Sequence, residues 1–267
     1  MRLLVMLAVA LTPTIGYSQA PVITGAVNAA SLAQDQPLSP GSLVSLFGTG
    51  LADSTATAST VPLPDSIAGV SVTFSGITAP LQFVSRGQIN LQVPWRVERG
   101  ITDIVVTLRG QTSAAFSAHV EPVSPGIFTI PSGSRQALAI NSDGSIAAAG
   151  SIPGVRTAEA SVGNTLMILA TGLGLVTPAI TDGAASSDQV RTTVATPTVL
   201  VCGYPALVTF SGLSPQFVGV NQINIVVPAG AWGPSGGGGG ECPIQIELGG
   251  IRSSDEVTIA VLGKWDY

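Results

Sequence analysis

Apolar and polar residues alternate along most of this chain with the two-residue period of β-strands. In residues 69–76, Val70, Val72 and Phe74 fall on one face, while small polar residues fall on the other. Residues 88–94 alternate in the same way. Such segments recur at intervals of roughly ten residues, with turn-forming residues between them, as in β-sandwiches. The pattern therefore predicts an all-β fold with few helices.

The chain also repeats itself. GSLVSLFGTGL at 41–51 matches GNTLMILATGL at 163–173, and QINLQVP at 88–94 matches QINIVVP at 222–228. Two further pairs of blocks follow the same order, namely SVTFSG with TVLVCG and DIVVTLRG with PIQIELGG. We therefore expect two copies of one structural unit, which the strand spacing predicts to be two tandem immunoglobulin-like β-sandwich domains.

The repeats divide the chain into four predicted parts. These are a signal peptide at 1–20, an immunoglobulin-like domain with an N-terminal lead-in at 21–123, a connector at 124–162, and a second immunoglobulin-like domain at 163–267. Asp143-Gly144 supplies the turn of a β-hairpin that we expect within the connector. The second copy carries extra residues between two of its strands, within 210–219.

The first residues, MRLLVMLAVAL, place one Arg before a short apolar run, and small residues follow, as in a secretory signal peptide. The run is shorter than the ~20 apolar residues that a membrane helix needs. We therefore expect a secreted protein, either extracellular or periplasmic, with no integral membrane segment after signal cleavage.

The low content and negative sign of the charge bear on which partners the chain could bind. Only 9% of the residues are charged and the formal net charge is -5, without a cluster of Lys and Arg that could neutralise phosphates. We therefore expect no nucleic-acid partner. The motifs likewise indicate no cofactor.

Cys202 and Cys242 are the two cysteines. Cys202 ends one predicted strand and Cys242 opens another, and an even cysteine count in a secreted chain favours a disulfide. Two buried free thiols are the alternative. The equivalent positions in the first copy are Ser75 and Thr102.

Several motifs together resemble a known family. They are GSLVSLFGTGLA, PLPDSIAGVSV, QINLQVPW, SPGIFT, NSDGS, LATGLG, FSGLSP and QINIVVP. This ordered set, spanning about residues 22–262, resembles the Solibacter-type uncharacterised C-terminal domain family of secreted acidobacterial proteins. The phrase VSLFGTGL also resembles the first strand of IPT/TIG domains. The resemblance implies a secreted immunoglobulin-like module and brings no catalytic residues.

Candidate catalytic and metal-binding motifs are sparse. His119 is the one histidine, and alternation places it on a polar strand face without a recognisable nucleophile and acid. GPSGG at 233–237 matches G-x-S-x-G in letters, but it lies in a poly-Gly segment and no histidine follows it. Residues 141–145 lack the alternating acids of a calcium loop, so a turn is favoured. We therefore predict neither a catalytic nor a metal site.

Two sets of residues remain as candidates for ligand binding. Gln88 and Asn90, like Gln222 and Asn224 in the second copy, project from the polar face of equivalent strands. Their amides could bind a ligand, or they could bond to neighbouring strands and loops. Trp95 and Trp232 lie at equivalent strand ends, where they could stack on sugar rings or cap the core.

Three hypotheses for function follow. The first is a secreted, non-catalytic interaction module for adhesion or extracellular assembly, and its partner would be an extracellular protein or polysaccharide. The second is a carbohydrate-binding module that uses the Trp, Asn and Gln positions. The third is a hydrolase whose site assembles between the domains. The sequence favours a protein that is not an enzyme.

Overall fold

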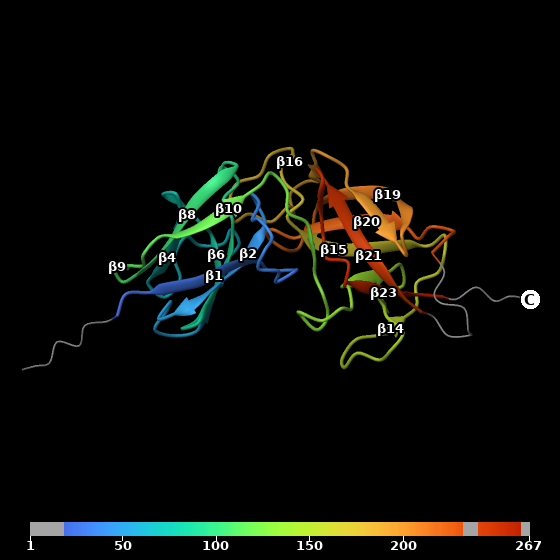
Figure 1. Ribbon diagram of the computed structural model, residues 1–267, viewed down its shortest axis with the longest axis horizontal. Coiled ribbons are helices and arrows are strands. Elements are labelled where there is room, and N and C mark those ends of the chain that lie inside the picture. The colour runs from blue at the N-terminus through green and yellow to red at the C-terminus, as the bar shows by residue number, and fades with distance from the viewer. Residues whose placement is uncertain (1–18, 232–239, 263–267) are drawn as a thin grey trace, which may run out of the picture.

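The structure is a computed structural model, and it describes residues 19–231 and 240–262. Figure 1 shows two lobes side by side, with β1, β2, β4, β6 and β8 to β10 labelled in the first and β14, β15, β19 to β21 and β23 in the second. Every regular element in the described residues is a β-strand. The predicted fold is confirmed, because the chain forms two tandem immunoglobulin-like β-sandwiches.

The first sandwich packs two antiparallel layers face to face. One layer has the order β1 (Val22–Asn28), β2 (Leu43–Thr49), β7 (Gln88–Gln92), β6 (Leu81–Val84) and β3 (Ala56–Thr57). The other has the order β10 (Phe116–Val120), β8 (Gly100–Leu108), β4 (Val70–Phe74) and β5 (Ile77–Thr78), with β9 (Gln111–Thr112) also paired to β8. The alternating apolar residues of both layers, including Leu46, Phe74 and Ile89, are fully buried between them.

The second sandwich repeats the central pairings of this arrangement but joins its two layers differently. Its strands are β15 (Thr165–Thr171), β16 (Val176–Thr177), β17 (Thr192–Thr193), β18 (Thr198–Val201), β19 (Tyr204–Leu213), β20 (Asn221–Val226), β21 (Gly240–Leu248), β22 (Ile251–Arg252) and β23 (Thr258–Val261). Strand β19 pairs with both β18 and β20, so it joins the two layers at a corner. In the first sandwich, the separate strands β5 and β6 occupy that place.

Residues 124–162, predicted as a connector, contribute to the second sandwich. They form β11 (Gly126–Ile127), β12 (Ala139–Asn141), β13 (Ile146–Ala147) and β14 (Thr157–Ala158). Both β11 and β12 pair with β15, while β12 and β13 pair with each other in antiparallel fashion. Ile127, Ala139 and Ala147 belong to the second core. Many of the buried residues in this segment are alanines. Because alanine is only weakly apolar, the sequence pattern did not identify these strands as part of the core.

The predicted disulfide between Cys202 and Cys242 is confirmed. It joins the end of β18 to the start of β21 and closes a loop with a sequence separation of 40. At the equivalent place in the first sandwich, the hydroxyl groups of Ser75 and Thr102 lie within hydrogen-bonding distance at 3.0 Å. The same position between two paired strands of one layer is therefore covalent in one copy and hydrogen-bonded in the other.

Parts of the chain lie outside the described residues. Most of the predicted signal peptide, which was placed at 1–20, is among them, as are Trp232 and Trp265. Within the described ranges, no helix is long and apolar enough to cross a membrane.

Candidate binding groove between the two sandwiches

A groove of about 810 Å³ runs between the two sandwiches and is hereafter called the groove. Its floor is the outer face of the first sandwich, where β2 presents Ser45 and Phe47 and β7 presents Gln88 and Asn90. These side chains point outward because the intervening residues of both strands are buried in the core. Sequence alternation thus places a row of polar groups and one phenyl ring at the floor of a concave site.

The amides at the floor bond to each other and keep free groups for a ligand. Gln88 Nε2 donates to Asn90 Oδ1 at 2.7 Å, and Ser45 Oγ donates to the same oxygen at 3.1 Å. Among the described residues, no hydrogen bond is made by Gln88 Oε1 or Asn90 Nδ2. The pair is therefore held in a fixed orientation, while the Gln88 carbonyl oxygen and the Asn90 amide nitrogen stay available to a ligand.

Both sandwiches supply the walls. Residues 57–63 of the first sandwich form one wall, with the side chain of Val61 59% exposed. Phe128 and Leu169 of the second sandwich contribute to the other, together with Phe217, which is 53% exposed. Phe217 belongs to the 214–220 segment between β19 and β20, where the sequence places the extra residues of the second copy.

The described lining of the groove carries no charged side chain. Its polar members are the amides and hydroxyls of Ser, Thr, Asn and Gln, and its apolar members include three phenylalanines. An ionic ligand would find no counter-charge there, and burying an unpaired charge is costly. The site therefore suits an uncharged ligand with both polar and apolar faces.

Buried hydrogen bonds across the junction fix the two walls relative to each other. Thr171 is fully buried; its Oγ1 accepts from Leu43 N at 2.9 Å and donates to Gly219 O at 2.7 Å. One hydroxyl thus joins β2 of the first sandwich to the 214–220 segment of the second. A Cβ on Gly219 would lie 2.9 Å from Leu43 side-chain atoms, so this close approach requires glycine.

A second contact is made by residues 178–190, which we call the strap. Gly183 N donates to Gln92 Oε1 at 2.7 Å, and Leu63 N donates to Gly183 O at 2.8 Å. Gln92 is 1% exposed, and its Nε2 also donates to Gly41 O at 3.2 Å. The strap therefore ties the second sandwich to the strand that carries Gln88 and Asn90.

Trp95 lies at this junction and is not part of the groove lining. Its backbone N–H donates to Asp182 Oδ1 of the strap at 2.7 Å, and its half-buried ring packs against Gly41. The indole Nε1 is buried without a hydrogen-bond partner among the described residues. The sequence left two roles open for Trp95, stacking on a ligand or capping the core, and this placement favours the structural one. The corresponding prediction for Trp232 falls outside the described residues.

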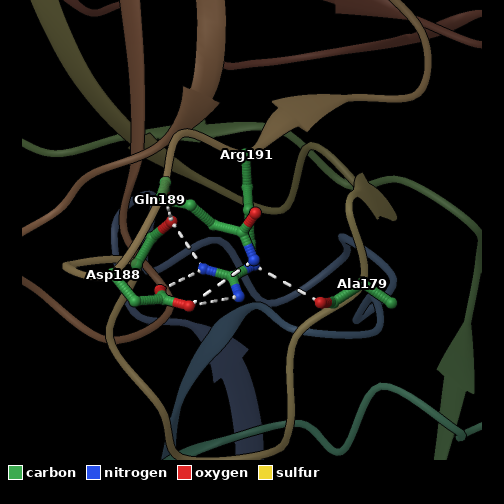
Figure 2. Close-up of polar contacts among 5 residues, drawn as sticks. Ala179, Asp188, Gln189 and Arg191 are labelled. Carbon is green, nitrogen blue, oxygen red and sulfur yellow. Dashed lines mark hydrogen bonds and ion pairs between the residues drawn. The ribbon is translucent and has the colours of Figure 1, made fainter.

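Arg191 holds the strap in shape. Its side chain is only 7% exposed and forms a bidentate ion pair with Asp188, with distances of 2.6 and 3.0 Å. Figure 2 shows the guanidinium between Asp188 and Ala179, whose carbonyl accepts from Arg191 Nε at 3.4 Å. The hydrogen bond from Arg191 lowers the pKa of Asp188 from 3.8 to about 2.

We expect the stabilisation from this ion pair to depend on pH. Because folding lowers the pKa of Asp188, the pair stabilises the folded state above pH 3.8 and loses that effect as the pH falls toward about 2. Asp188→Asn should therefore destabilise the protein at neutral pH, and its difference from wild type should shrink at acid pH. Urea unfolding of both proteins across this range measures the difference. Asp35→Asn, at an exposed aspartate with no ion pair in the described structure, is the control; a difference for Asp188→Asn that stays constant down to pH 2 would contradict the assignment.

The second amide pair lies in a smaller pocket of about 430 Å³. Gln222 and Asn224 of β20 line it together with Phe210 of β19 and part of the strap. Gln222 Nε2 donates to Asn224 Oδ1 at 3.0 Å, as in the first copy. The two sets of sequence-predicted amides are therefore not brought together in one site.

Other polar residues show local structural roles. The side chain of His119 is 52% exposed, with Nε2 3.4 Å from a carboxylate oxygen of Glu121, which also pairs with Arg99. In the turn between β12 and β13, Asp143 accepts from the hydroxyl and backbone N–H of Ser145, and these bonds lower its pKa. Within the described ranges, no three His, Cys, Asp or Glu side chains gather as metal ligands would.

Comparisons with known proteins give structural likeness only. No family model and no curated protein matches the sequence. One similar solved structure is the Bacteroides ovatus mixed-linkage glucan utilization locus protein SGBP-B in complex with a mixed-linkage heptasaccharide, at 13% identity and a TM-score of 0.36, covering 91% of this chain and 46% of that one. SGBP-B from a complex xyloglucan utilization locus in Bacteroides uniformis matches at 12% identity and a TM-score of 0.25, over 92% of this chain and 49% of that one.

Domains 5–6 of the S-layer protein SbsC match at 12% identity and a TM-score of 0.28, covering 91% of this chain and 99% of that one. This chain thus spans less than half the length of either SGBP-B protein. TM-scores this low carry no argument about ligands, so the functional case rests on the groove.

Proposed function

We propose that this chain is a secreted, non-catalytic binding module whose groove holds an uncharged carbohydrate. The observation that carries the proposal is the groove lining, which combines phenyl rings with oriented amides and has no charged side chain in its described part. Sugar rings expose apolar C–H faces that pack on aromatic rings, and their hydroxyls both donate and accept hydrogen bonds. The free acceptor of Gln88 and free donor of Asn90 match two neighbouring hydroxyls of one ring.

The rigid junction supports the same proposal. Both walls are fixed by buried hydrogen bonds through Thr171 and Gln92, so the groove exists before the ligand arrives. A preformed site avoids the entropic cost of ordering loops during binding. The disulfide accords with a secreted location, because such bonds persist mainly outside the cytosol. Membership of the Solibacter-type family stays a prediction.

A protein partner is the second candidate. Val61 and Phe217 are more than half exposed on opposite walls of the groove, and paired apolar side chains of this kind also anchor protein interfaces. Adhesion or extracellular assembly through this groove would use the same apolar contacts. The carbohydrate proposal requires ligand hydrogen bonds from Gln88 and Asn90, whereas the protein-partner candidate relies on the apolar contacts.

Asn90→Ala should weaken carbohydrate binding about tenfold, because it removes one ligand hydrogen bond and releases the side chain that orients Gln88. Affinity electrophoresis of the chain without its signal peptide, in gels that contain a soluble neutral β-glucan, a mannan or a xylan, measures the change. Polygalacturonate serves as the anionic probe, and Gln111→Ala, at an exposed amide on β9, is the matched control variant.

Retardation by at least one neutral polysaccharide, with none by polygalacturonate, is the expected result. If no neutral polysaccharide retards the wild-type protein, carbohydrate binding is wrong and the protein-partner hypothesis replaces it. If Asn90→Ala binds as well as Gln111→Ala, the groove is not the binding site.

A further inference from the structure

The smaller pocket reproduces the chemistry of the groove floor in the second sandwich. Phe210 lines this pocket and lies opposite Asn224 in the sheet register, as Phe83, which does not line the groove, lies opposite Asn90 in the first copy. In both copies, the Gln amide nitrogen donates to the Asn amide oxygen, at 2.7 Å in the first and 3.0 Å in the second. As with the first pair, no described residue bonds to Gln222 Oε1 or Asn224 Nδ2, so the same acceptor and donor remain available.

The strap makes this pocket suitable for an uncharged ligand. Residues 186–190 line it, and the side chain of Val190 is 72% exposed, which offers an apolar contact. Asp188 also lines the pocket, but both of its oxygens are taken by the guanidinium of Arg191. The one carboxylate of the pocket is therefore neutralised, and the remaining described lining is apolar or uncharged polar.

A single stretch of backbone, the 214–220 segment, separates the groove from the smaller pocket. Pro215 lines the smaller pocket, whereas the next residues, Gln216 and Phe217, line the groove. Because these consecutive residues face different sites, the groove and the smaller pocket lie on either side of the 214–220 segment. This segment therefore forms a narrow ridge between them. A linear polymer that leaves the groove over Phe217 therefore reaches the smaller pocket within a short distance.

We propose that the Gln222–Asn224 pocket is a second subsite for the same uncharged polysaccharide, and that one polymer chain occupies the groove and this pocket together. This inference rests on the proposed function of the groove. Once the groove holds one part of the polymer, the local concentration of the next part at the second subsite is high, so binding at both sites strengthens overall affinity without new contacts. Oligosaccharides too short to cross the ridge gain nothing from the second subsite.

The test measures affinity against ligand length for two variants of the second subsite. Calorimetric titrations use oligosaccharides from trisaccharide to decasaccharide, prepared from the same β-glucan, mannan and xylan, followed by the intact polysaccharides. Asn224→Ala removes the ligand donor. Val190→Asp places a charge in the pocket at an exposed position, which keeps folding intact, and Val194→Asp is its control at a residue that is 69% exposed and outside the pocket lining.

We expect wild type and the Val194→Asp control to bind long chains at least about tenfold more tightly than trisaccharides, and both subsite variants to lose this gain while trisaccharide binding is unchanged. Equal polymer affinity for wild type, Asn224→Ala and Val190→Asp would overturn the second subsite and leave the groove proposal standing. Failure of the wild-type protein to bind any of the three glycans would overturn both proposals.

Discussion

Replacing Cys202 and Cys242 together with serine is expected to lower the free energy of unfolding by about 4 kcal/mol. The disulfide closes a loop with a sequence separation of 40, so its loss restores much conformational freedom to the unfolded chain. Cys242 is also 2% exposed and belongs to the second core, where a serine hydroxyl would be poorly accommodated. Guanidinium unfolding followed by circular dichroism, with the wild-type protein kept oxidised, measures the effect.

The first sandwich provides the control for this prediction. Ser75→Ala removes the hydrogen bond to Thr102 and the exposed one that Ser75 Oγ accepts from Asp103 N, and it should cost only about 1 kcal/mol. Dithiothreitol should destabilise the wild-type protein as the double substitution does and leave the double variant unaffected. A midpoint of unfolding that does not change upon reduction would show that the bridge contributes nothing to stability.

Thr171→Val is expected to cost about 3 kcal/mol, although the two side chains have nearly the same shape. The substitution removes the hydroxyl that accepts from Leu43 N and donates to Gly219 O, and both backbone groups would then be buried without a partner. Because valine fills the same space and leaves no cavity, the change in the free energy of unfolding measures the loss of the two junction hydrogen bonds alone. Urea unfolding measures the loss, and carbohydrate affinity should fall with it because Thr171 fixes the two walls of the groove.

Thr49→Val is the matched control, because Thr49 occupies the equivalent position at the end of β2 in the first copy. Thr49 is exposed and its hydroxyl makes no hydrogen bond among the described residues, so we expect a change within about 0.5 kcal/mol. Equal stability of the Thr171→Val and Thr49→Val proteins would mean that the junction bonds do not stabilise the fold.

Much of the fold could be predicted from the sequence because its determinants are local. Period-two alternation in segments such as 70–74 identifies the strands and their buried faces, and two aligned sets of such segments indicate two sandwiches. The disulfide could be predicted from the even cysteine count of a chain expected to be secreted, with Cys202 at the end of one predicted strand and Cys242 at the start of another.

The groove could not be predicted, because alternation tells which face a residue occupies but not what packs against that face. Phe47, Phe128 and Phe217 are far apart in the sequence and meet only through the junction. The burial of Arg191 could not be predicted either, because a lone arginine in a loop is normally exposed. In the structure, the strap covers this side chain. The sequence held one weak indication of the role of Gln92 at the junction. This position is polar in the first copy, whereas the equivalent position in the second copy is Val226.

The amide pairs show why the sequence left two alternatives open. The sequence allowed either ligand binding or bonds to neighbouring groups, and the hydrogen bond between Gln and Asn orients each pair. In each pair, the Gln carbonyl oxygen and the Asn amide nitrogen make no hydrogen bond with another described residue. A structural contact within the pair and a binding role for its remaining groups are therefore compatible.

The central claim is that the floor of the groove binds an uncharged sugar through Gln88 and Asn90. Side-chain amide signals in ¹H–¹⁵N NMR spectra test it most directly, with oligosaccharides from the neutral glycan that retards the protein added stepwise. The account predicts saturable shifts of the Gln88 and Asn90 side-chain amides and of the backbone amide of Phe217, with no shift at Gln111. Saturable binding that leaves the Gln88 and Asn90 signals unmoved would contradict it.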